Sequence, residues 1–485
     1  MKLCRNTEIQ KYRNRENYKL KKYVEMIKMQ QKVFYSIDLF SGPGGICTGF
    51  KWANIKPLIA VEISDWTVET YRISHNADVL NLEQYLKNPI MYESLFDYNP
   101  EMKTLLIHGD ITKVTDDLIL DILSRRFQLC TVDIVTGGAP CESFSLAGKR
   151  SEEDDRNTLF LNVIRIARAI NSKMFLFENV KGLLSKKNDG QAGKMFEDIC
   201  DEFESLNHSS GISFKLSSRD KQKVLLNAQD YGVPQARERI FLIGINTKFQ
   251  VGFDYPKITH GVDKEFDYVS VGDALSCLPK IKSGEGNEIL PSDYNNYIST
   301  PTPAGKKFMN TMTGKDEEFE MLPHLEFNSS VVTFQKAVNH SEKMKNRMRL
   351  INQGEGMKKA ADRLIAEGKE ELIKKYFPNK LYASRNRRLK IDKPSFTVTS
   401  HCLDEIIHPT EDRGITPREA ARLQSFPDWY HIAGPYVKFH SDPEQDKYEQ
   451  IGDAIPPLLA YALGVEVSNT LNTIEKIYQM EEVGI

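Results

Sequence analysis

Long apolar runs are absent from this sequence of 485 residues. No stretch approaches the roughly 20 consecutive apolar residues that a membrane-spanning helix needs. The first residues carry basic side chains but no apolar signal core, which argues against export. Hydrophobic residues make up 40% and charged residues 27% of the chain, a balance typical of soluble globular proteins. We therefore expect a cytoplasmic protein with no membrane partner.

Cysteine is scarce as well. Seven cysteines are scattered along the chain, and no two have the Cys-x-x-Cys spacing. The ten histidines show no spacing typical of metal ligands. The sequence therefore predicts neither a disulfide framework nor a metal site. A reducing compartment would leave a single cysteine available as a working thiol.

A glycine-rich turn near the start of the chain lacks the Gly-x-Gly-x-x-Gly spacing of dinucleotide-binding proteins. Residues 33–39 predict a strand, Ser41-Gly42-Pro43-Gly44-Gly45 a tight turn, and residues 46–53 a helix. Exposed backbone N–H groups at such a turn suit a nucleotide-like ligand without a pyrophosphate.

Acidic residues follow the next predicted strands. Residues 58–61 end at Glu62, and residues 104–107 end at Gly109-Asp110. An acid about 20 residues past the glycines suits two ribose hydroxyls. Repeated strand–acid–helix units predict an α/β fold with a doubly wound, mostly parallel sheet that holds a nucleoside. The alternative, acids that only cap helices, stays open for each position taken alone.

A cysteine follows another predicted strand, residues 132–135, after Gly137-Gly138-Ala139-Pro140. The carboxyl edge of an open α/β sheet is where ligands bind, so Cys141 is placed for chemistry. A lone cysteine is more often a small buried hydrophobe, and on its own it would be interpreted that way.

Two further segments carry groups that suit acid–base chemistry. Glu178 stands at the end of a predicted strand over residues 175–180, where it is a candidate general acid. Arg237 and Arg239 are two residues apart, so on extended backbone they face the same side. Paired guanidiniums bind a phosphate or a polarised carbonyl oxygen, although a surface salt-bridge pair is the alternative.

These segments together resemble the cytosine-C5 DNA methyltransferases of the bacterial type. The resemblance covers nearly everything from about residue 33 to the C-terminal helix, in the family's order. The matching motifs are Asp38-Leu39-Phe40-Ser41-Gly42-Pro43-Gly44-Gly45, Pro140-Cys141, Glu178-Asn179-Val180, Gln235-Ala236-Arg237-Glu238-Arg239, Thr416-Pro417-Arg418-Glu419-Ala420-Ala421-Arg422-Leu423-Gln424-Ser425-Phe426-Pro427 and Gln450-Ile451-Gly452-Asp453-Ala454-Ile455-Pro456-Pro457.

The resemblance implies a class I, Rossmann-like methyltransferase with a smaller target-recognition domain. By it, Cys141 attacks C6 of a flipped-out cytosine, so that C5 accepts a methyl group from S-adenosylmethionine. Glu178, with its pKa raised by burial, hydrogen-bonds or protonates N3. Arg239, with Arg237 nearby, holds the base carbonyl. Expected cofactor contacts are Phe40, Pro43, Gly44, Gly45, Glu62, Ile63, Asp110, Ile111, Gly138, Pro140, Leu159, Asp453, Ala454 and Ile455.

Two residues depart from the family pattern. Glu142 follows the cysteine where glutamine or asparagine is usual, and Gly452-Asp453 stands where the family usually has Gly-Asn. An ionised aspartate accepts hydrogen bonds but does not donate them. Neither change touches the proposed nucleophile, acid or arginines, so we expect activity.

Positive charge concentrates in two places although the net charge is −2. Residues 1–32 hold 10 Lys/Arg and 3 Asp/Glu, and residues 336–393 hold 17 and 7. Such stretches suit phosphates, while solvated helix faces are the alternative. The candidates for DNA contacts are Lys343, Arg347, Arg349, Arg385, Arg387, Arg388 and Lys390.

We expect four parts in the chain. Residues 1–32 form a basic extension, residues 33–250 a catalytic and cofactor domain, and residues 251–385 a target-recognition domain with helices near 340–352 and 357–376. Residues 386–485 carry the last motifs, a helix opened by Thr416 and Pro417, and a long helix after Pro456-Pro457. This last helix returns to the catalytic domain.

Double-stranded DNA is the expected substrate and partner, and we expect a monomer. A separate cognate restriction endonuclease is a candidate partner, because the chain shows no nuclease motif. Two alternatives stay open: a tRNA cytosine-C5 methyltransferase and a catalytically inactive DNA-binding homologue. An amino-methyltransferase is excluded because no Asp/Asn/Ser-Pro-Pro-aromatic loop is present, and a nicotinamide oxidoreductase leaves Cys141 unexplained.

Overall fold

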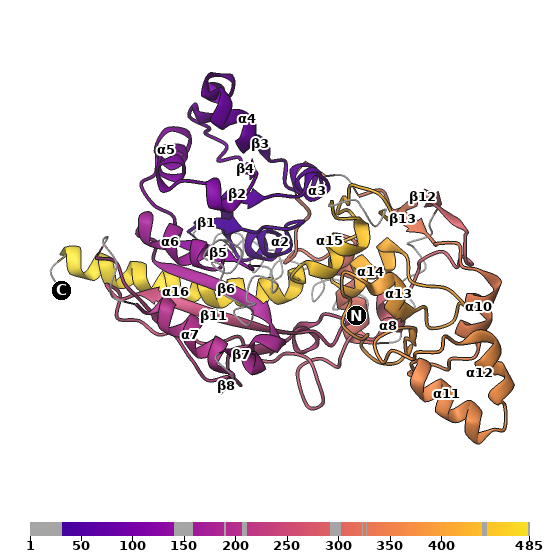
Figure 1. Ribbon diagram of the computed structural model, residues 1–485. Coiled ribbons are helices and arrows are strands. Elements are labelled where there is room, and N and C mark those ends of the chain that lie inside the picture. Colours follow the sequence, from indigo (N-terminus) through magenta and orange to yellow (C-terminus); the bar gives the residue numbers. More distant parts are fainter. Residues whose placement is uncertain are drawn as a thin grey trace, which may run out of the picture.

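The structure is a computed structural model of the whole chain (Figure 1). It describes residues 32–139, 159–188, 191–205, 211–291, 302–322, 324–325, 327–438 and 444–483. The expected N-terminal extension up to residue 31, and the expected site residues Pro140, Cys141 and Glu142, lie outside this part of the chain.

A nine-stranded sheet forms the centre of the molecule, in the order β10-β11-β6-β5-β1-β2-β4-β3, with β9 paired to β11. Six neighbouring strands from β6 to β3 run parallel, whereas β9, β10 and β11 pair antiparallel. This mostly parallel sheet confirms the expected fold class. The strands are β1 (Phe34–Leu39), β2 (Ile55–Glu62), β3 (Asp78–Asn81), β4 (Leu105–His108), β5 (Ile134–Gly137), β6 (Met174–Val180), β9 (Phe214–Leu216), β10 (Leu225–Asn227) and β11 (Glu238–Asn246).

Helices cover both faces of the sheet, which explains why its central strands are apolar throughout. One core cluster joins the strands to α5, α6 and α7, and others join them to α2, α3 and α16. The helices of this part are α2 (Gly45–Trp52), α3 (Asp65–His75), α4 (Leu82–Lys87), α5 (Asp116–Phe127), α6 (Leu161–Ala169), α7 (Lys194–Phe203) and α16 (Pro457–Val483). Shorter elements are η1 (Pro89–Phe96), η2 (Ile111–Lys113), η5 (Lys181–Ser185), β7 (Lys187–Asn188), β8 (Gln191–Ala192) and η6 (Ala228–Tyr231).

The C-terminal helix α16 returns to the start of the described chain and packs on α2 (Figure 1). Small residues line this crossing: a Cβ on Gly49 would lie 2.4 Å from the backbone nitrogen of Tyr461, and one on Gly464 would lie 2.9 Å from Cβ of Ala53. The hydroxyl of Ser468 donates to the carbonyl of Ala53 at 2.6 Å. The backbones therefore meet closely, and the last motif before α16 is held beside the glycine turn that opens α2.

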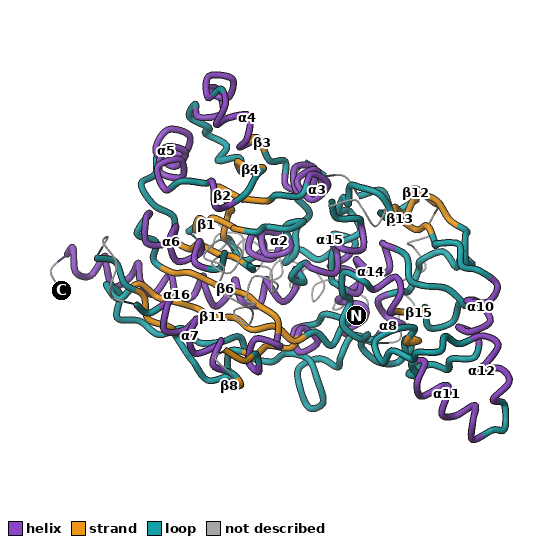
Figure 2. Tube along the Cα trace, in the orientation of Figure 1, coloured by secondary structure: helices purple, strands orange, loops and turns teal. Residues whose placement is uncertain are grey.

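The remaining chain forms a second part at the right of Figure 1, where short helices and loops predominate (Figure 2). Thr416 caps α14 in a capping box with Glu419, and Pro417 is its first residue, as expected. The elements are α8 (Val271–Ala274), β12 (Gly286–Pro291), α9 (Pro303–Met312), β13 (Val331–Lys336), α10 (Glu342–Arg349), α11 (Met357–Ala366), α12 (Glu370–Tyr376), β14 (Arg387–Arg388), α13 (Cys402–Glu405), β15 (Ile406–Ile407), α14 (Pro417–Leu423) and α15 (Lys447–Asp453).

The prediction of one helix over residues 357–376 is wrong. The chain forms α11 and α12 instead, and Gly368 between them has a φ of +71°. A glycine adopts this left-handed conformation at little cost, so it ends α11 where the apolar pattern alone continues. The helix expected near 340–352 is present but shorter, as α10.

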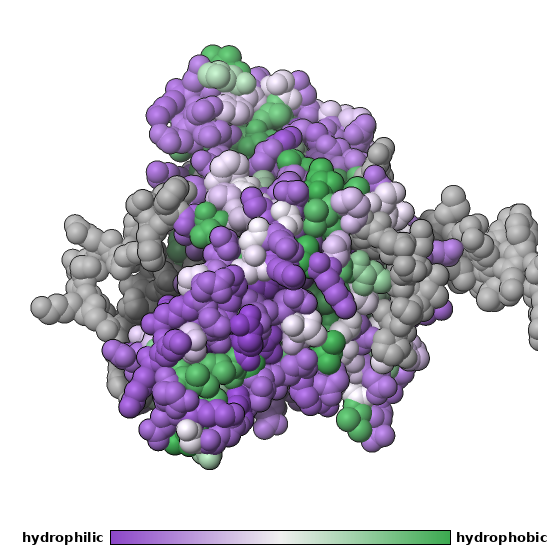
Figure 3. Space-filling view, turned by 90° about the vertical axis from the view of Figure 1, so that its right-hand side faces the viewer, coloured by the Kyte–Doolittle hydropathy of each residue, from purple (hydrophilic) through white to green (hydrophobic). Residues whose placement is uncertain are grey.

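The face of the molecule in Figure 3 is mainly hydrophilic, with small hydrophobic areas. One of them covers α4 and η1 at the top, where Leu86, Ile90 and Met91 are exposed. Within the described residues, none of the helices combines the length and the apolar character needed to cross a membrane.

Candidate active site at the carboxyl edge of the sheet

The expected site residues gather where the strand order reverses. β1 lies between β2 and β5, so the chain leaves β1 in one direction along the sheet and later returns on the other side. In doubly wound sheets this reversal opens a crevice at the carboxyl ends of the strands. The glycine turn after β1, the acid at the end of β2 and the loop after β5 all begin at this edge.

The glycine turn after β1 is shaped by left-handed backbone and close neighbours. Gly42 and Gly44 have φ values of +54° and +97°. A Cβ on Gly44 would lie 2.3 Å from Nε2 of His75, and one on Gly45 would lie 2.0 Å from the carbonyl oxygen of Ile455. Only glycine fits at both positions, so the turn is pressed between α3 and the segment before α16.

Tyr430, His75 and Lys51 form a hydrogen-bonded row of side chains that supports this turn. The hydroxyl of Tyr430 donates to the carbonyl of Pro43, and Nε2 of His75 lies 2.8 Å from that hydroxyl. Because the hydroxyl proton is already used, we assign the ring proton of His75 to Nε2. Nδ1 then accepts from Nζ of Lys51 at 2.9 Å. Burial holds the pKa of His75 well below its usual range, so the ring is neutral.

Sequence reasoning missed this supporting row. His75 and Lys51 belong to no recognised motif, and Tyr430 lies just beyond one. The one available signal was the apolar setting of His75 and Lys51 on their helical segments, which does not reveal their partners.

Glu62 closes the other side of the turn. Its carboxylate accepts hydrogen bonds from the backbone N–H groups of Gly42 at 2.9 Å, Ile63 at 2.8 Å and Ser64 at 3.0 Å. Burial raises its pKa, and these three bonds oppose the rise. Each carboxylate oxygen has two acceptor positions, so the group keeps capacity for a ligand. Ile63 beside it is 62% exposed, which leaves an apolar surface at the strand end.

Asp110 acts as a local cap, which is the alternative that the sequence left open. Its side chain accepts from the backbone N–H of Thr112 at 2.9 Å and opens η2, while Ile111 is buried.

The other expected cofactor residues lie partly or wholly in the protein core. Phe40 and Leu159 are partly buried and pack against the core cluster that includes α5, α6 and α7. Ala454 and Ile455 are buried, and Asp453 accepts from Nε2 of Gln445 at 2.9 Å.

The same edge carries the candidate acid and the start of the cysteine loop. Oε1 of Glu178 lies 3.1 Å from Nε of Arg239, on the neighbouring strand β11. A Cβ on Gly138 would lie 2.7 Å from Oε2 of Glu178. The side-chain amide of Asn179 donates to the carbonyl of Ala139 at 3.0 Å. The chain therefore leaves β5 in contact with the acid, two residues before the undescribed Cys141.

Burial raises the pKa of Glu178, the direction expected of a proton donor. Arg239 and Arg237 oppose this rise, and the carboxylate of Asp453 adds to it. Desolvation favours the neutral acid and the arginines favour the anion. The net direction is upward, so the carboxyl is protonated over a wider pH range than an ordinary glutamate.

Arg237 does not stand free beside Arg239, which corrects the expected arginine pair. Its guanidinium is fully buried and donates to three backbone carbonyls: Val398 at 2.7 Å, Gly452 at 2.8 Å and Ala454 at 3.0 Å. Arg239 does lie beside Glu178. It also donates to the backbone carbonyl of its chain neighbour Glu238 at 2.9 Å. The charge of Arg237 acts on the acid at longer range, while its donors hold the backbone.

A family model described as C-5 cytosine-specific DNA methylase matches residues 34–88 and 85–469. The chain belongs to this family. It is a DNA cytosine-5 methyltransferase, as the motifs suggested.

Curated relatives agree over nearly the whole length of the chain. The type II methyltransferase M.DdeI of Desulfomicrobium norvegicum is 30% identical, over 89% of this chain and 88% of its own. The type II methyltransferase M1.HphI of Haemophilus parahaemolyticus is 29% identical, over 90% and 87%. A crystal structure of a putative DNA modification methyltransferase from an Escherichia coli prophage shares the fold, with a TM-score of 0.61, 23% identity, and coverage of 90% and 99%.

The basic residues that this methyltransferase was expected to use on DNA divide into two groups. Lys343, Arg385 and Lys390 are exposed. The guanidinium of Arg385 lies 5.3 Å from the ring centroid of Tyr382, and Lys390 lies 3.4 Å from Asp392.

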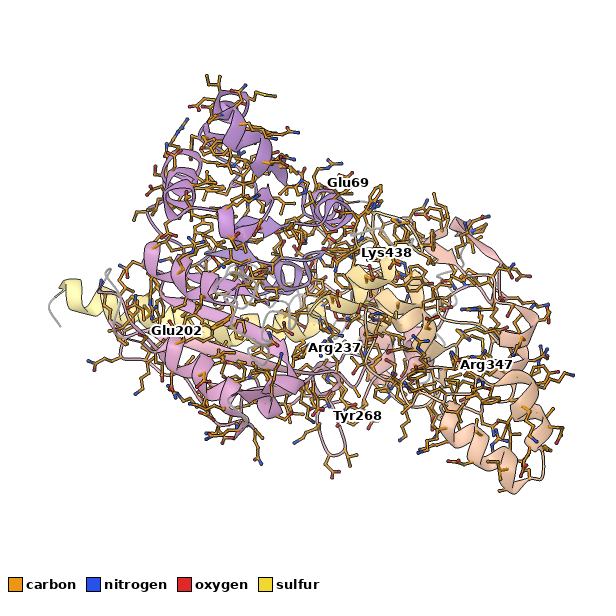
Figure 4. The ribbon with its side chains drawn as sticks, in the orientation of Figure 1. Glu69, Glu202, Arg237, Tyr268, Arg347 and Lys438 are labelled. Atoms are coloured by element: carbon orange, nitrogen blue, oxygen red, sulfur yellow. The ribbon has the colours of Figure 1, made fainter. Side chains whose placement is uncertain are left out.

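The other basic residues are engaged within the protein. Arg388 is buried and donates to the carboxylate of Asp412 and to the carbonyls of Met348, Ile351, His408 and Glu411, so its expected phosphate contact is wrong. Arg347 (Figure 4) donates to the carbonyl of Tyr376 and the side chain of Asn386. Arg387 stacks at 4.5 Å on Phe396. Arg349 is exposed as well, but its guanidinium pairs with Asp412 at 3.0 Å.

Proposed function

We propose that this protein transfers a methyl group from S-adenosylmethionine to C5 of a cytosine flipped out of a specific double-stranded DNA sequence. One observation carries the proposal. The acid Glu178, whose side chain is 12% exposed, is paired with Arg239 at 3.1 Å and packs against Gly138, at the start of the loop that bears Cys141. An acid, a base-binding cation and a thiol loop at one sheet edge are what attack on a pyrimidine ring requires.

Cys141 is the proposed nucleophile. Its thiolate forms a bond to C6, which moves electron density to C5 and makes that carbon nucleophilic. C5 then bonds the methyl group as the methyl–sulfonium bond breaks, with the electron pair of that bond left on the departing sulfur, and a base removes the C5 proton. The electron pair of that C–H bond restores the C5–C6 double bond and expels the thiolate of Cys141. The ring becomes accessible only when the base leaves the duplex.

Glu178 and Arg239 stabilise the ring during this attack. The neutral carboxyl of Glu178 donates its proton to N3, where negative charge collects as sulfur adds to C6, and takes that proton back once C5 has bonded the methyl group. Arg239 holds the adjacent carbonyl oxygen through charge-assisted hydrogen bonds. Arg237 supports this arrangement through the backbone rather than by touching the base.

The residues around the glycine turn fit S-adenosylmethionine. The cofactor supplies an electrophilic methyl group on sulfonium. Among the described residues, the buried hydroxyl of Ser41 has no hydrogen-bond partner, and the carboxylate of Glu62 keeps acceptor capacity beside it. We assign the ribose to Glu62, and the adenine to Phe40, Ile63, Asp110 and Ile111. The other proposed pocket residues are Pro43, Gly44, Gly45, Gly138, Pro140, Leu159, Asp453, Ala454 and Ile455.

The second part of the chain supplies DNA recognition in this proposal. Its exposed basic residues Lys343, Arg385 and Lys390 contact phosphates, while the sheet domain carries the chemistry. Both curated relatives are named type II methyltransferases, which supports a role as the modification enzyme of a restriction–modification pair. The cognate endonuclease would then be a separate protein, and the methyltransferase acts as a monomer in the bacterial cytoplasm.

Bisulfite sequencing tests the proposal directly. The chain and its Cys141→Ser variant are expressed in a host that lacks cytosine methylation, and the host DNA is sequenced after bisulfite treatment. We expect protected cytosines in one short sequence context, and none with the variant. Protection that persists in the variant would reject the covalent role of Cys141. No protection with soluble wild-type protein would favour a tRNA substrate or a binding role.

A further inference from the structure

Three fully buried polar side chains connect four segments next to the catalytic edge. Gln235, Arg237 and Gln424 are each 0% exposed. Figure 4 shows Arg237 where the ribbon leading into β11 meets the yellow C-terminal ribbon. Its guanidinium bridges Val398 on one side and the carbonyls of Gly452 and Ala454 on the other.

The two glutamines extend this connection. Gln235 accepts from the backbone N–H of Val398 at 2.8 Å and donates to the carbonyl of Leu423 at 3.0 Å. It also donates to the side chain of Gln424 at 2.8 Å. Gln424 in turn donates to the carbonyl of Ile451 at 2.7 Å. Every segment that meets here is therefore tied to the residues just before Arg239.

Close packing of the backbone keeps these hydrogen-bonded segments rigid relative to one another. A Cβ on Gly452 would lie 2.1 Å from the carbonyl carbon of Thr399, so the two backbones are in contact. The backbone N–H of Ala236 donates to Ser395 at 2.9 Å, and that of Ser395 donates to Pro234 at 2.9 Å. A buried arginine that bridges carbonyls in such a setting cannot shift one segment without shifting the others.

We propose that Arg237 is a positioning residue that couples the cofactor pocket to the base-binding arginine. The inference rests on the proposed function, because it assigns residues 453–455 to the cofactor and Arg239 to the base. Cofactor contact fixes the backbone around Asp453, and Arg237 transmits that order to residues 235–239 and to Val398. Arg239 then meets Glu178 in the geometry that the flipped base needs.

Lysine at this position keeps the positive charge but lacks the planar fork that reaches several carbonyls at once. Arg237→Lys should therefore keep much of the electrostatic effect on Glu178 and lose the mechanical link. Arg422→Lys is a matched control. Arg422 is equally buried and lies next to Leu423, but its guanidinium pairs with Asp428 and donates to the carbonyls of Ala274 and Ser276, all outside residues 234–239, 395–400 and 450–455.

Hydrogen exchange with and without S-adenosylhomocysteine, the demethylated and unreactive cofactor, tests the coupling. In the wild type we expect the ligand to slow exchange several-fold both at residues 450–455 and at residues 234–239 and 395–400. In Arg237→Lys the first segment should keep its protection, while the other two lose it. Arg422→Lys should show the wild-type pattern even where its unfolding temperature falls.

The outcomes separate the inference from the proposed function. Wild-type spread of protection in Arg237→Lys would overturn the coupling role and leave methylation untouched. A wild type that binds no S-adenosylhomocysteine would overturn both. If Arg237→Lys does not fold, Gln424→Leu takes its place, because it removes the bond to Ile451 and must also weaken the spread of protection. Full spread in that variant rejects the connection.

Discussion

At the scale of single residues, the proposed mechanism depends on a carboxyl that holds a proton near neutral pH. Glu178 is buried, which raises its pKa, and the arginines beside it act in the opposite direction. The charged groups that face it among the described residues are Arg239, Arg237 and Asp453. The outcome is a balance, so changing one of these charges should move the pKa of the acid.

Asp453→Asn should move the pH profile of methyl transfer. The carboxylate of Asp453 raises the pKa of Glu178, so its neutralisation should lower that pKa. Because the proposed mechanism uses the protonated acid, it predicts that activity is lost as pH rises through the pKa. The basic limb of kcat against pH should therefore shift to lower pH in the variant. The initial rate of tritiated methyl transfer between pH 5 and 9 measures the shift.

The control for this change is Glu178→Gln, which removes the titrating group itself. Loss of a general acid typically costs 100- to 10,000-fold in rate, and the limb assigned to Glu178 should disappear with it. A basic limb that stays unmoved in Asp453→Asn, or persists in Glu178→Gln, would assign that limb to another group.

Asp38 provides a second titration, this time in stability. It is buried at the end of β1, accepts from Thr136 at 2.6 Å and from Cys47 at 3.1 Å, and burial raises its pKa to about 6. Its stabilising contribution is complete below the unfolded pKa near 3.8 and is lost as pH rises through about 6. In the wild type, this titration should lower the free energy of unfolding by on the order of 3 kcal/mol between pH 4 and pH 8. Urea unfolding should show that Asp38→Asn abolishes this decrease.

Asp263 is exposed and provides the matched control. In Asp263→Asn the free energy of unfolding should keep the pH dependence of the wild type. If Asp38→Asn shows the same slope of unfolding free energy against pH as this control, Asp38 does not carry the titration.

The sequence predicted the residues that carry chemistry better than the residues that hold them. Glu178 and Arg239 were recognised because their chemistry requires a residue type within a motif, and the structure pairs them. The support of Pro43 by Tyr430 and His75 was missed, because Tyr430 lies 387 residues from Pro43 and 355 residues from His75. Arg237 and Arg388 were misassigned for the same reason: an arginine that binds carbonyls and one that binds phosphate look alike in a sequence.

At the scale of elements, the crossing of α2 and α16 joins the glycine turn after β1 to the last motif. The prediction that the final helix turns back came from the family resemblance, whereas the small residues that let the two helices touch were not identified. The broken helix over residues 357–376 shows the complementary limit, because an apolar repeat runs on past the glycine that ends α11.

Gly49→Ala should destabilise the protein through this crossing. The added Cβ would lie 2.4 Å from two backbone atoms, the carbonyl oxygen of Pro457 and the nitrogen of Tyr461. Neither atom can move without shifting α16, so we expect a loss of about 1–3 kcal/mol. Urea unfolding measures it. Gly252→Ala is the control, since no heavy atom lies within 4 Å of its added Cβ, and equal stability losses in both variants would contradict the tight crossing.

At the scale of the whole molecule, charge is divided between parts that do different work. The net charge is −2, yet residues 336–393 carry a balance of +10. Composition alone predicted a phosphate-binding stretch there, but it could not tell which of its cations the fold consumes. Arg388 and Arg347 stabilise the second part from within, and the exposed Lys343, Arg385 and Lys390 remain available to DNA.

The salt dependence of DNA binding tests this division. Each phosphate contact that is lost lowers the slope of log K against log salt by about 0.9. The double variant Arg385→Glu/Lys390→Glu should therefore flatten the slope by about two and weaken binding to all DNA sequences alike. Fluorescence anisotropy with a labelled duplex from 50 to 300 mM salt measures it. Lys215 is an exposed lysine on β9, a strand of the central sheet that pairs with β11, and Lys215→Glu should leave the slope unchanged. An unchanged slope in the double variant would mean that DNA lies across another face, and the phosphate contacts would have to be sought elsewhere on the described surface.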